Sequence, residues 1–425
     1  MPAKHPWYRP RHYLHLDSPI GYKRARRVVT SPKRVARHSF YPFISYHVTS
    51  KKLKQDKATK TLKIKRKNRP IRYAAHLDAH IYSYYALMLS SLYEEALAKR
   101  GISDSVLAFR SLRKSNIEFA ADAFGEIKSR GDCSVVALDI SGFFDNLDHE
   151  ILKNAWASLL GESRLPADHY AVFKSLTKYS AVDKESLYKK LNISLNNPKA
   201  GNRKRLCEAV EFREKVRRTG LVKKNCEPFG IPQGSSISAL LSNIYMFQFD
   251  IKSSEEMERL GGKYYRYCDD MLFIVPKEHK EKIEEFAISN IDNLCIDINP
   301  DKTEKREFTV ENEKIISDRP LQYLGFTYDG QQILIRSAAL ARYSEKMKRG
   351  VRLAKATMKK RNRLRIYRGE SPKPIYRNNL YKRYSHLGQR NFITYGFRAA
   401  ETFNSTAIRK QLKPLWKRLT KEIET

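Results

Sequence analysis

Two short apolar segments, each carrying aspartate at a defined place, constrain this chain more than any other feature. The run CSVVALDI (133–140) is rich in β-branched residues and predicts a buried strand that ends at Asp139. The run KYYRYCDDMLFIV (263–275) has two strand-forming arms around Asp269 and Asp270, and it predicts a tight hairpin with both carboxylates at its tip. We therefore expect carboxylates from two strands to meet in one cleft.

Such a cluster of carboxylates needs a compensating cation, because adjacent negative charges repel one another beside an apolar hairpin. Carboxylate oxygens suit Mg²⁺, which takes its other ligands from water and substrate phosphates. With Asp139 and Asp269 converging, two Mg²⁺ ions could activate a primer 3′-hydroxyl and neutralise a leaving pyrophosphate. The alternative for the Asp269–Asp270 pair on its own is a structural turn, in which Asp is common.

A third segment, GIPQGSSIS (230–238), precedes the helix-like run ALLSNIYMFQFD. Its glycines permit close backbone approach, Pro232 stiffens the entry, and Gln233 offers both a donor and an acceptor. The segment either holds a nucleotide base or template backbone, or is an ordinary turn with a serine at the helix start. A further helix is expected after the Asp139 strand, beginning near Asn146 or Asp148.

The distribution of charge indicates the kind of partner. The chain has 82 Lys and Arg against 46 Asp and Glu, a net charge of +36, of which residues 1–72 carry +19 and residues 331–425 carry +20. The centre, 73–330, carries −3. Two basic ends around a near-neutral centre predict binding of a polyanion and favour nucleic acid over a role in solubility alone.

The basic N-terminal segment interleaves aromatic rings with its cations. It contains Trp7, Tyr8, Arg9 and Arg11, and such a mixture can stack on unpaired bases while the cations hold phosphates. Ordinary aromatic packing is the alternative interpretation of the same residues.

Several classes of protein are excluded or disfavoured by the sequence. No run approaches about 18 uncharged apolar residues, which argues against a membrane protein. Residues 1–40 lack the apolar region of a secretory leader. Five scattered Cys without a CxxC pair predict a reducing compartment, a cytoplasmic location, and neither a disulfide framework nor a zinc site.

Five motifs resemble, in chain order, the palm motifs of reverse transcriptases. They are LDISGFFD, GIPQGSSISALLSNIY, YRYCDDMLFIV, INPDKTE and LQYLGF. The resemblance covers about residues 60–340 and is closest to the bacterial lineages that include retron, group II intron and defence-associated enzymes. The segment WYRPRHYLHLDSPI (7–20) is also similar to the N-terminal extension of the defence-associated (antiphage) branch.

The resemblance implies an α+β fold, the right-hand polymerase with fingers, palm and thumb, an antiparallel palm sheet and a helical basic thumb. The expected domains are a basic N-terminal extension (1–60), fingers (61–130), a palm (131–336) and a basic helical thumb and C-terminal region (337–425). A charged insertion at about 161–226 interrupts the palm, and it either binds a partner RNA or is a surface excursion.

Site roles also follow from the resemblance. It implies that Asp139, Asp269 and Asp270 bind metal, together with the backbone carbonyl of Ile140, and that Phe144 is a steric gate selecting deoxynucleotides. The other nucleotide-binding residues it implies are Gln233, Arg72, Arg110 and Lys302, the last near the pyrophosphate. It implies a primer grip of Tyr323, Leu324, Gly325 and Phe326.

The implied activity is RNA-directed DNA polymerase, a nucleotidyltransferase that uses dNTPs and two Mg²⁺ ions. The expected partners are an RNA template, a structured non-coding RNA, and the DNA product, in a bacterial antiviral defence role. An RNA-templated RNA polymerase on the same palm and a non-catalytic RNA-binding scaffold are the alternatives.

Overall fold

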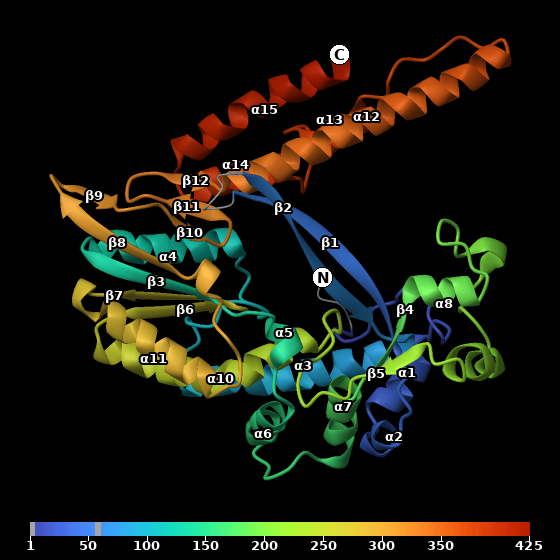
Figure 1. Ribbon diagram of the computed structural model, residues 1–425, viewed down its shortest axis with the longest axis horizontal. Coiled ribbons are helices and arrows are strands. Elements are labelled where there is room, and N and C mark those ends of the chain that lie inside the picture. The colour runs from blue at the N-terminus through green and yellow to red at the C-terminus, as the bar shows by residue number, and fades with distance from the viewer. Residues whose placement is uncertain (1–4, 56–60) are drawn as a thin grey trace.

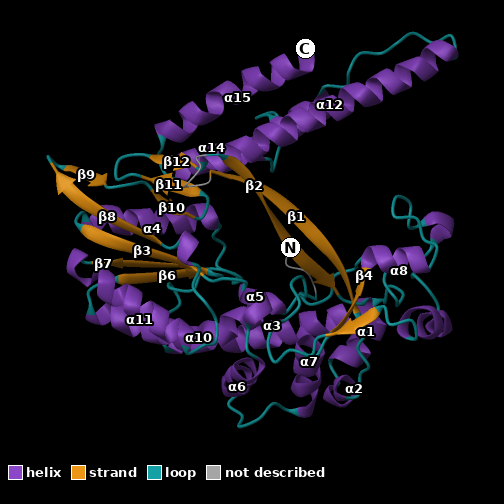
Figure 2. Cartoon of the chain, in the orientation of Figure 1, coloured by secondary structure: helices purple, strands orange, loops and turns teal. Residues whose placement is uncertain are grey.

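The computed structural model describes residues 5–55 and 61–425. The described residues form a mixed α+β fold in which helices surround three β-sheets (Figure 1). Figure 2 shows most of the strands on the left, where β8 (Glu304–Glu311) and β9 (Lys314–Ser317) reach the edge of the molecule. The long β1 (Phe43–Gln55) and β2 (Leu62–Tyr73) cross the middle, and helices make up the lower body and an upper arm.

The central sheet has five strands in the order β6-β7-β3-β8-β9, and every neighbouring pair is antiparallel. This confirms the α+β class and the antiparallel pairing of the two aspartate-bearing runs. Its strands are β3 Cys133–Asp139, β6 Lys263–Tyr267, β7 Asp270–Val275, β8 Glu304–Glu311 and β9 Lys314–Ser317.

Both faces of the central sheet are covered, which explains why β3 is apolar without a break. Successive side chains of a strand point to opposite faces. Val135 belongs to a core shared with α4 (Asn116–Arg130). Val136 belongs to the core on the other face, under α10 (Ser238–Arg259) and α11 (Lys280–Asp292). The helix predicted after GIPQGSSIS is α10.

A second sheet is built on a long hairpin whose strands are β1 (Phe43–Gln55) and β2 (Leu62–Tyr73). The sheet order is β2-β1-β4-β5, with β4 (Ser180–Asp183) parallel to β1 and β5 (Val222–Lys224) at its edge. Because β1 pairs with β2 along its whole length, the expected boundary at residue 60 would cut the hairpin, and β1 belongs structurally with the segment predicted as fingers.

The helices below the sheets contribute to the core that contains Val136. They are α1 Tyr22–Val29, α2 Pro32–Ala36, α3 His76–Lys99, α6 His149–Leu159 and α7 Ala167–Thr177. The predicted start of α6 is confirmed, since Asp148 is its N-cap and accepts hydrogen bonds from the backbone of Glu150 and Ile151. The side chain of Asp148 thereby satisfies two amides that the helix itself leaves unpaired.

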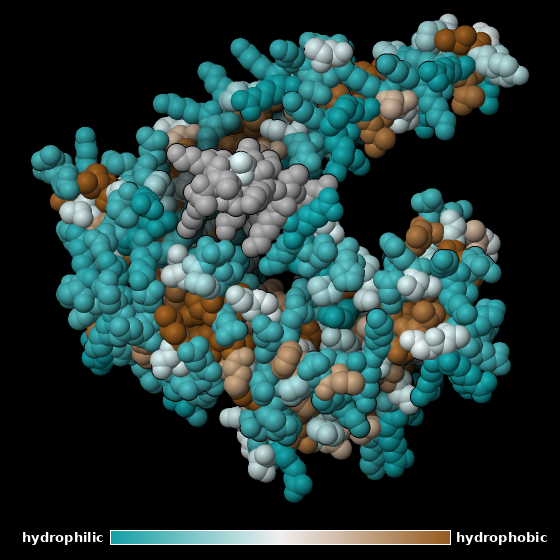
Figure 3. Space-filling model, in the orientation of Figure 1, coloured by the Kyte–Doolittle hydropathy of each residue, from teal (hydrophilic) through white to brown (hydrophobic). Residues whose placement is uncertain are grey.

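The C-terminal region is helical, as expected from its basic helical periodicity. It follows a three-stranded sheet of β10 Leu321–Tyr323, β11 Phe326–Tyr328 and β12 Ile333–Ile335, and it consists of α12 Ser337–Tyr367, α13 Asn378–Tyr384, α14 Phe392–Thr402 and α15 Thr406–Glu424. The outer half of α12 extends beyond the body as the end of the upper arm (Figure 1). Figure 3 shows an open gap on the right between this arm and the lower body.

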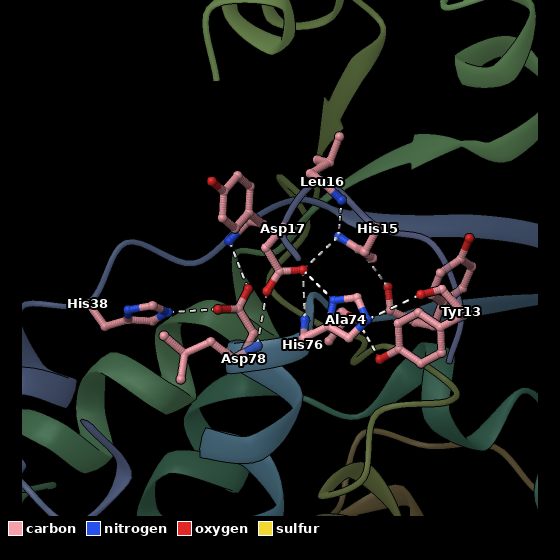
Figure 4. A network of polar contacts seen from close by, with 11 residues as sticks. Tyr13, His15, Leu16, Asp17, His38, Ala74, His76 and Asp78 are labelled. Atoms are coloured by element: carbon pink, nitrogen blue, oxygen red, sulfur yellow. Dashed lines mark hydrogen bonds and ion pairs between the residues drawn. The ribbon is translucent and has the colours of Figure 1, made fainter. Parts of the chain in front are cut away.

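The N-terminal segment lies against α3 through the polar network drawn in Figure 4. Both carboxylate oxygens of Asp17 accept hydrogen bonds from the first backbone amides of α3, at His76 (2.9 Å) and Leu77 (3.1 Å). A carboxylate at this position also opposes the positive end of the helix dipole. The buried Asp78 accepts from the amide of Tyr41 at 2.8 Å and lies 2.7 Å from His38 Nε2. Asp17 and the buried Asp78 therefore anchor the N-terminal segment to α3 through hydrogen bonds between residues that are distant in the sequence.

This packing corrects the interpretation of Trp7 as a base-stacking residue. Trp7 is buried at 8% exposure, with its ring edge-on to Tyr84, so the packing interpretation holds for it. Tyr8 is half-buried, stacks on His80 and donates its hydroxyl to the backbone of Ile20. Contact of Tyr8 with a nucleic-acid base stays a prediction.

Arg11 is also held within the protein. Its guanidinium donates to the carbonyl of Ala79 (3.3 Å) and to the hydroxyl of Ser83 (3.1 Å). Arg9 is exposed, and its predicted contact with nucleic acid stays a prediction.

The predicted insertion at 161–226 has two structurally different parts. Its α7 packs into the main core, where Val172 and Leu176 are fully buried. Residues 180–224 form a small lobe with a core of its own, whose elements are β4, α8 Lys184–Lys190, η1 Ala200–Asn202, α9 Ala209–Glu211, η2 Phe212–Arg217 and β5. Only this lobe departs from the body of the fold.

Within the described parts of the chain, none of the helices combines the length and the apolar character that crossing a bilayer requires.

Candidate active site

Asp139 and Asp270 lie directly opposite each other in the central sheet. Asp139 is the last residue of β3, Asp270 is the first of β7, and the two are register partners in the antiparallel ladder. Directly opposite residues point to the same face, with their Cβ atoms about 5 Å apart. Like charges at such positions repel, so the sheet holds two carboxylates where pairing rules disfavour them.

Alternation along the strands fixes which face these carboxylates occupy. Asp139 shares its face with Val135, and Asp270 shares its face with Leu272 and Ile274; all three apolar residues belong to the α4 core. The carboxylates therefore continue that face beyond the point where the apolar core ends.

Asp269 lies in the two-residue turn between β6 and β7 rather than on either strand. Tyr267 pairs with Asp270 across this turn, which confirms the tight hairpin. The first turn residue, Cys268, has φ +61°, a left-handed conformation that is strained for a residue with a side chain. The carbonyl of Asp269 accepts a hydrogen bond from the amide of Ile140 at 3.2 Å, which ties the turn to the end of β3.

The electrostatics of the site reflect this crowding. Burial, followed by the nearby carboxylates of Asp269 and Asp139, raises the pKa of Asp270 to about 7. Lys302, at the end of η4 (Pro300–Lys302), forms an ion pair with Oδ2 of Asp139 and acts in the opposite direction on Asp270. The structure thus places one cation against a pair of repelling carboxylates.

These groups line a cavity of about 1000 Å³. Its polar wall combines both carboxylates with basic residues from three separate parts of the chain. The lining includes Arg66, Lys67, Asn116, Asp139, Tyr267, Asp270, Asn299, Asp301, Lys302, Glu304, Tyr323, Leu324, Gly325 and Arg336. Of the three predicted metal-binding aspartates, the cavity lining includes Asp139 and Asp270 and does not include Asp269.

The predicted primer grip forms one edge of the cavity. Leu324 (φ +45°) and Gly325 (φ +97°) make the two-residue turn between β10 and β11, with two left-handed residues as the hairpin twist favours. Tyr323, Leu324 and Gly325 line the cavity, whereas Phe326 is fully buried and packs edge-to-face on Phe403. Phe326 therefore supports the turn from beneath and cannot touch a primer, which corrects that part of the prediction.

Two residues that the sequence reasoning missed hold this turn in place. Asn116, the first residue of α4, donates from Nδ2 to the carbonyl of Leu324 at 2.9 Å. The amide of Arg336 donates to the carbonyl of Gly325 at 3.1 Å. Asn116 follows Ser115, which with Glu118 forms a capping box, and that pattern marks a helix start but gives no signal of a contact 208 residues away.

A second cluster joins Gln233, Arg72 and the short helix α5 (Phe143–Asn146). The carbonyl of Gln233 accepts from the amide of Arg72 at 2.8 Å, and its side-chain amide donates to Asp145 at 3.4 Å. Gly234 is required here, because its φ is +110° and an added Cβ would lie 2.7 Å from the carbonyl of Arg72. Neither Gln233 nor Arg72 lines the large cavity, so the structure groups these predicted nucleotide-binding residues beside it.

Arg72 has unused hydrogen-bonding capacity in this cluster. Its guanidinium lies 4.9 Å from the ring centre of Tyr179, and the buried Nε and Nη1 atoms have no hydrogen-bond partner among the described residues. Phe144 is half-buried on the neighbouring α5, whereas Phe143 is buried in the core. Buried guanidinium donors without a partner suit an anion such as a phosphate.

Arg110, the other predicted phosphate ligand, is a structural residue. Its side chain is 3% exposed and forms a bidentate ion pair with Glu94 of α3, at 2.9 and 2.6 Å. A further guanidinium nitrogen donates to the carbonyl of Val106. A buried, fully satisfied guanidinium is not available to a triphosphate, so this prediction is wrong.

Comparison with known protein families decides the class. Residues 65–328, more than half of the chain, match the family described as reverse transcriptase (RNA-dependent DNA polymerase). The chain belongs to the reverse transcriptase family. The matched range runs from β2 to the end of β11, so it contains the central sheet and both aspartate-bearing strands.

Solved structures with a similar arrangement include two telomerases. The apo telomerase of Candida tropicalis, truncated from its C-terminal domain, has a TM-score of 0.43 and 13% identity, over 69% of this reverse transcriptase and 57% of that chain. The telomerase of Candida albicans in complex with a TWJ fragment of telomeric RNA has a TM-score of 0.40 and 11% identity, over 93% and 66%. This reverse transcriptase thus spans less than two thirds of either chain. No curated protein sequence matches it.

The donor set of the reverse transcriptase suits a hard divalent cation. Asp139 and Asp270 supply two carboxylates on one face, and burial together with the neighbouring carboxylates raises the pKa of Asp270. Within residues 5–55 and 61–425, no three His, Cys, Asp or Glu side chains are grouped as a ready metal-binding cluster. Two carboxylates fit Mg²⁺, which keeps waters and takes further oxygens from substrate phosphates.

Proposed function

We propose that this reverse transcriptase copies an RNA template into DNA from dNTPs, with Asp139 and Asp270 at the centre of the reaction and two Mg²⁺ ions. The observation that carries the proposal is the register pairing of these two aspartates on one face of the central sheet, in a cavity that Arg66, Lys67, Lys302 and Arg336 also line. Such a pair has no structural use, because it repels itself.

Asp139, Asp269 and Asp270, together with the carbonyl of Ile140, would hold the ions; Asp269 lies in the turn and Ile140 directly follows the end of β3. When bound, Mg²⁺ lowers the pKa of a primer hydroxyl and neutralises charge on the transferring phosphate. Lys302, beside Asp139, is placed to hold or protonate a departing phosphate oxygen. The orphaned donors of Arg72 would bind the triphosphate from the Gln233 cluster.

The arrangement in Figure 1 supports a right-hand polymerase fold with fingers, palm and thumb. The central sheet would be the palm, the β1–β2 hairpin with α3 and α4 the fingers, and the helical arm from α12 onward the thumb. The Leu324–Gly325 turn at the cavity edge would position the primer end.

Replacing Phe144 with alanine should relax the choice of sugar. Phe144 follows Asp139 by five residues, is half-buried on α5 and lies one hydrogen bond from the Gln233 loop, since its carbonyl accepts from Ile231. Removing the ring opens room for a ribose 2′-hydroxyl, so the ratio of deoxynucleotide to ribonucleotide incorporation should fall at least about tenfold. Single-nucleotide extension of a primed RNA template measures this ratio.

The control for that experiment is Phe144→Leu, which keeps most of the bulk and should keep most of the discrimination. If the wild-type protein incorporates ribonucleotides as fast as deoxynucleotides, Phe144 is no gate and the RNA polymerase alternative gains.

We further propose that the enzyme acts in bacterial antiviral defence by copying a structured partner non-coding RNA. The support is the similarity of WYRPRHYLHLDSPI and the palm motifs to defence-associated enzymes. Cells that carry the wild-type protein with its native flanking DNA should lower phage plating efficiency, and cells with Asp139→Ala should not. Equal protection by both would contradict a catalytic defence role.

A further inference from the structure

The lobe of residues 180–224 lies at the end of the fold opposite the central sheet (Figure 1). Its core contains Leu187, Leu206 and Val216, together with Leu14 and Leu16 of the N-terminal segment and Ile44 of β1. The amide of Leu206 donates to the carbonyl of His15 at 2.8 Å. The N-terminal segment, which Asp17 holds against α3, therefore also packs against the lobe.

The lobe accounts for the apparent neutrality of the centre of the chain. Residues 180–224 contain 13 Lys and Arg against four Glu and one Asp, a net charge of +8. The remaining central residues, 73–179 and 225–330, carry −11. A basic lobe is thus joined to an acidic body, and a positive charge this concentrated in 45 residues attracts a polyanion.

Much of this charge is exposed and lacks a carboxylate partner. Lys189 and Lys190 of α8 are exposed, as are Arg217 and Arg218, and none of the four forms an ion pair with a described carboxylate. Other exposed cations of the lobe are Lys199, Arg203, Lys204, Arg213, Lys223 and Lys224.

A shallow cavity lies beside two of these cations. It has a volume of about 440 Å³ and is lined by Ser186, Lys189, Lys190, Thr219 and Leu221. The hydroxyls of Ser186 and Thr219 donate within the lobe, to Asp183 and to backbone carbonyls, so the donors open to a ligand here are the ammonium groups of Lys189 and Lys190. Ammonium groups of this kind bind phosphate oxygens.

The surface of the lobe favours a paired nucleic acid over a single strand. Binding of unpaired bases needs exposed aromatic rings as stacking platforms. The lobe's aromatic side chains, Tyr188 and Phe212, are buried or half-buried, and its large exposed apolar side chains are the aliphatic Leu195 and Val210. A surface of cations and hydroxyls without exposed aromatic rings can bind the phosphate backbone of double-stranded RNA, which proteins recognise mainly by its shape.

We propose that the lobe binds the phosphate backbone of a double-stranded stem of the template RNA, outside the catalytic cavity, with Lys189 and Lys190 at its centre. The proposal rests on the proposed function only in taking the template to be RNA. Figure 3 shows an open gap between the arm and the right-hand part of the lower body, where α8 of the lobe lies in Figure 1. Nucleic acid that extends from the cavity toward the lobe would occupy this gap.

The test is binding of a double-stranded RNA of about 30 base pairs, which is longer than one typical module covers. The Lys189→Gln/Lys190→Gln variant should bind this RNA about tenfold more weakly at about 0.15 M salt, and the slope of log Kd against log salt should fall by about 1 for each lysine. Gln is polar and has a helix propensity close to that of Lys, so folding should be preserved. Fluorescence anisotropy across a salt series gives both quantities.

The matched control is Lys128→Gln/Lys252→Gln, which removes two exposed charges from α4 and α10 and should leave Kd nearly unchanged. Extension of a short RNA template with a DNA primer, small enough to occupy only the cavity, should be equal in the lobe variant and the wild type. Equal loss of binding in both double variants, or no loss in the lobe variant, would overturn the proposal. Because binding needs no synthesis, the result stands whether or not the protein polymerises.

Discussion

Asp139→Asn should abolish DNA synthesis while leaving RNA binding intact. The substitution keeps the size of the side chain and removes the negative charge that faces Asp270 across the ladder. Metal-assisted neutralisation of phosphate charge contributes several kcal/mol, and ~4 kcal/mol corresponds to a factor of about a thousand in rate. We therefore expect deoxynucleotide incorporation on a primed RNA template to fall at least about a thousandfold, measured in single turnover.

The control is Asp132→Asn, the same change just before the other end of β3. Asp132 is exposed and pairs with Lys277 on the surface, and such pairs contribute little to stability. The control should retain full incorporation. Because Asp139→Asn also relieves repulsion at Asp270, the variant should be at least as stable to unfolding as the wild type. Normal incorporation by a folded Asp139→Asn protein would remove Asp139 from the reaction.

Asp250→Ala should produce the largest loss of stability. Asp250 of α10 and Arg266 of β6 are both fully buried and form a bidentate ion pair at 2.7 and 2.6 Å, and Tyr264 also donates to Asp250. Removing one partner leaves a buried, uncompensated charge, which costs about 3–5 kcal/mol. Chemical denaturation should show the free energy of unfolding falling by that amount.

Glu256→Ala is the control on the same helix, because its partner Arg259 is exposed and the expected change is below about 1 kcal/mol. The double change Asp250→Leu with Arg266→Met removes both charges and should recover much of the stability. It should not recover full activity, since Arg266 also donates to the carbonyl of Cys268 in the strained active-site turn, at 3.1 Å. Full activity in a stable double variant would show that this contact does not position the turn.

The strands and their pairing could be predicted from the sequence because the signal is local. The apolar run before Asp139 and the two arms around Asp269 and Asp270 determine strand type, and a two-residue turn determines the hairpin register. Side chains alternate between the two faces of a strand. Once β7 is known to be the partner of β3, this alternation predicts that Asp270 lies on the same face as Asp139 and shares its cavity. The partner strand itself is a non-local choice, and no local pattern specifies it.

The failed predictions share a different cause. Trp7 and Arg110 belong to residue types that bind nucleic acid when exposed, and the sequence does not say which of them are already used inside the protein. Arg110 is neutralised by Glu94, 16 residues earlier on another element. The charged insertion was predicted, but the net charge of the centre does not show its excess of positive charge, because the acidity of the body cancels it.

The most direct test of the central claim is Mg²⁺-dependent incorporation of dATP into a primer annealed to poly(U) RNA by the purified wild-type chain. We predict extended product with Mg²⁺, no product when the metal is chelated, and no product from Asp139→Asn at equal RNA occupancy. A protein that binds the RNA tightly yet yields no Mg²⁺-dependent product on this or other primed RNA templates would contradict the account and favour a non-catalytic scaffold.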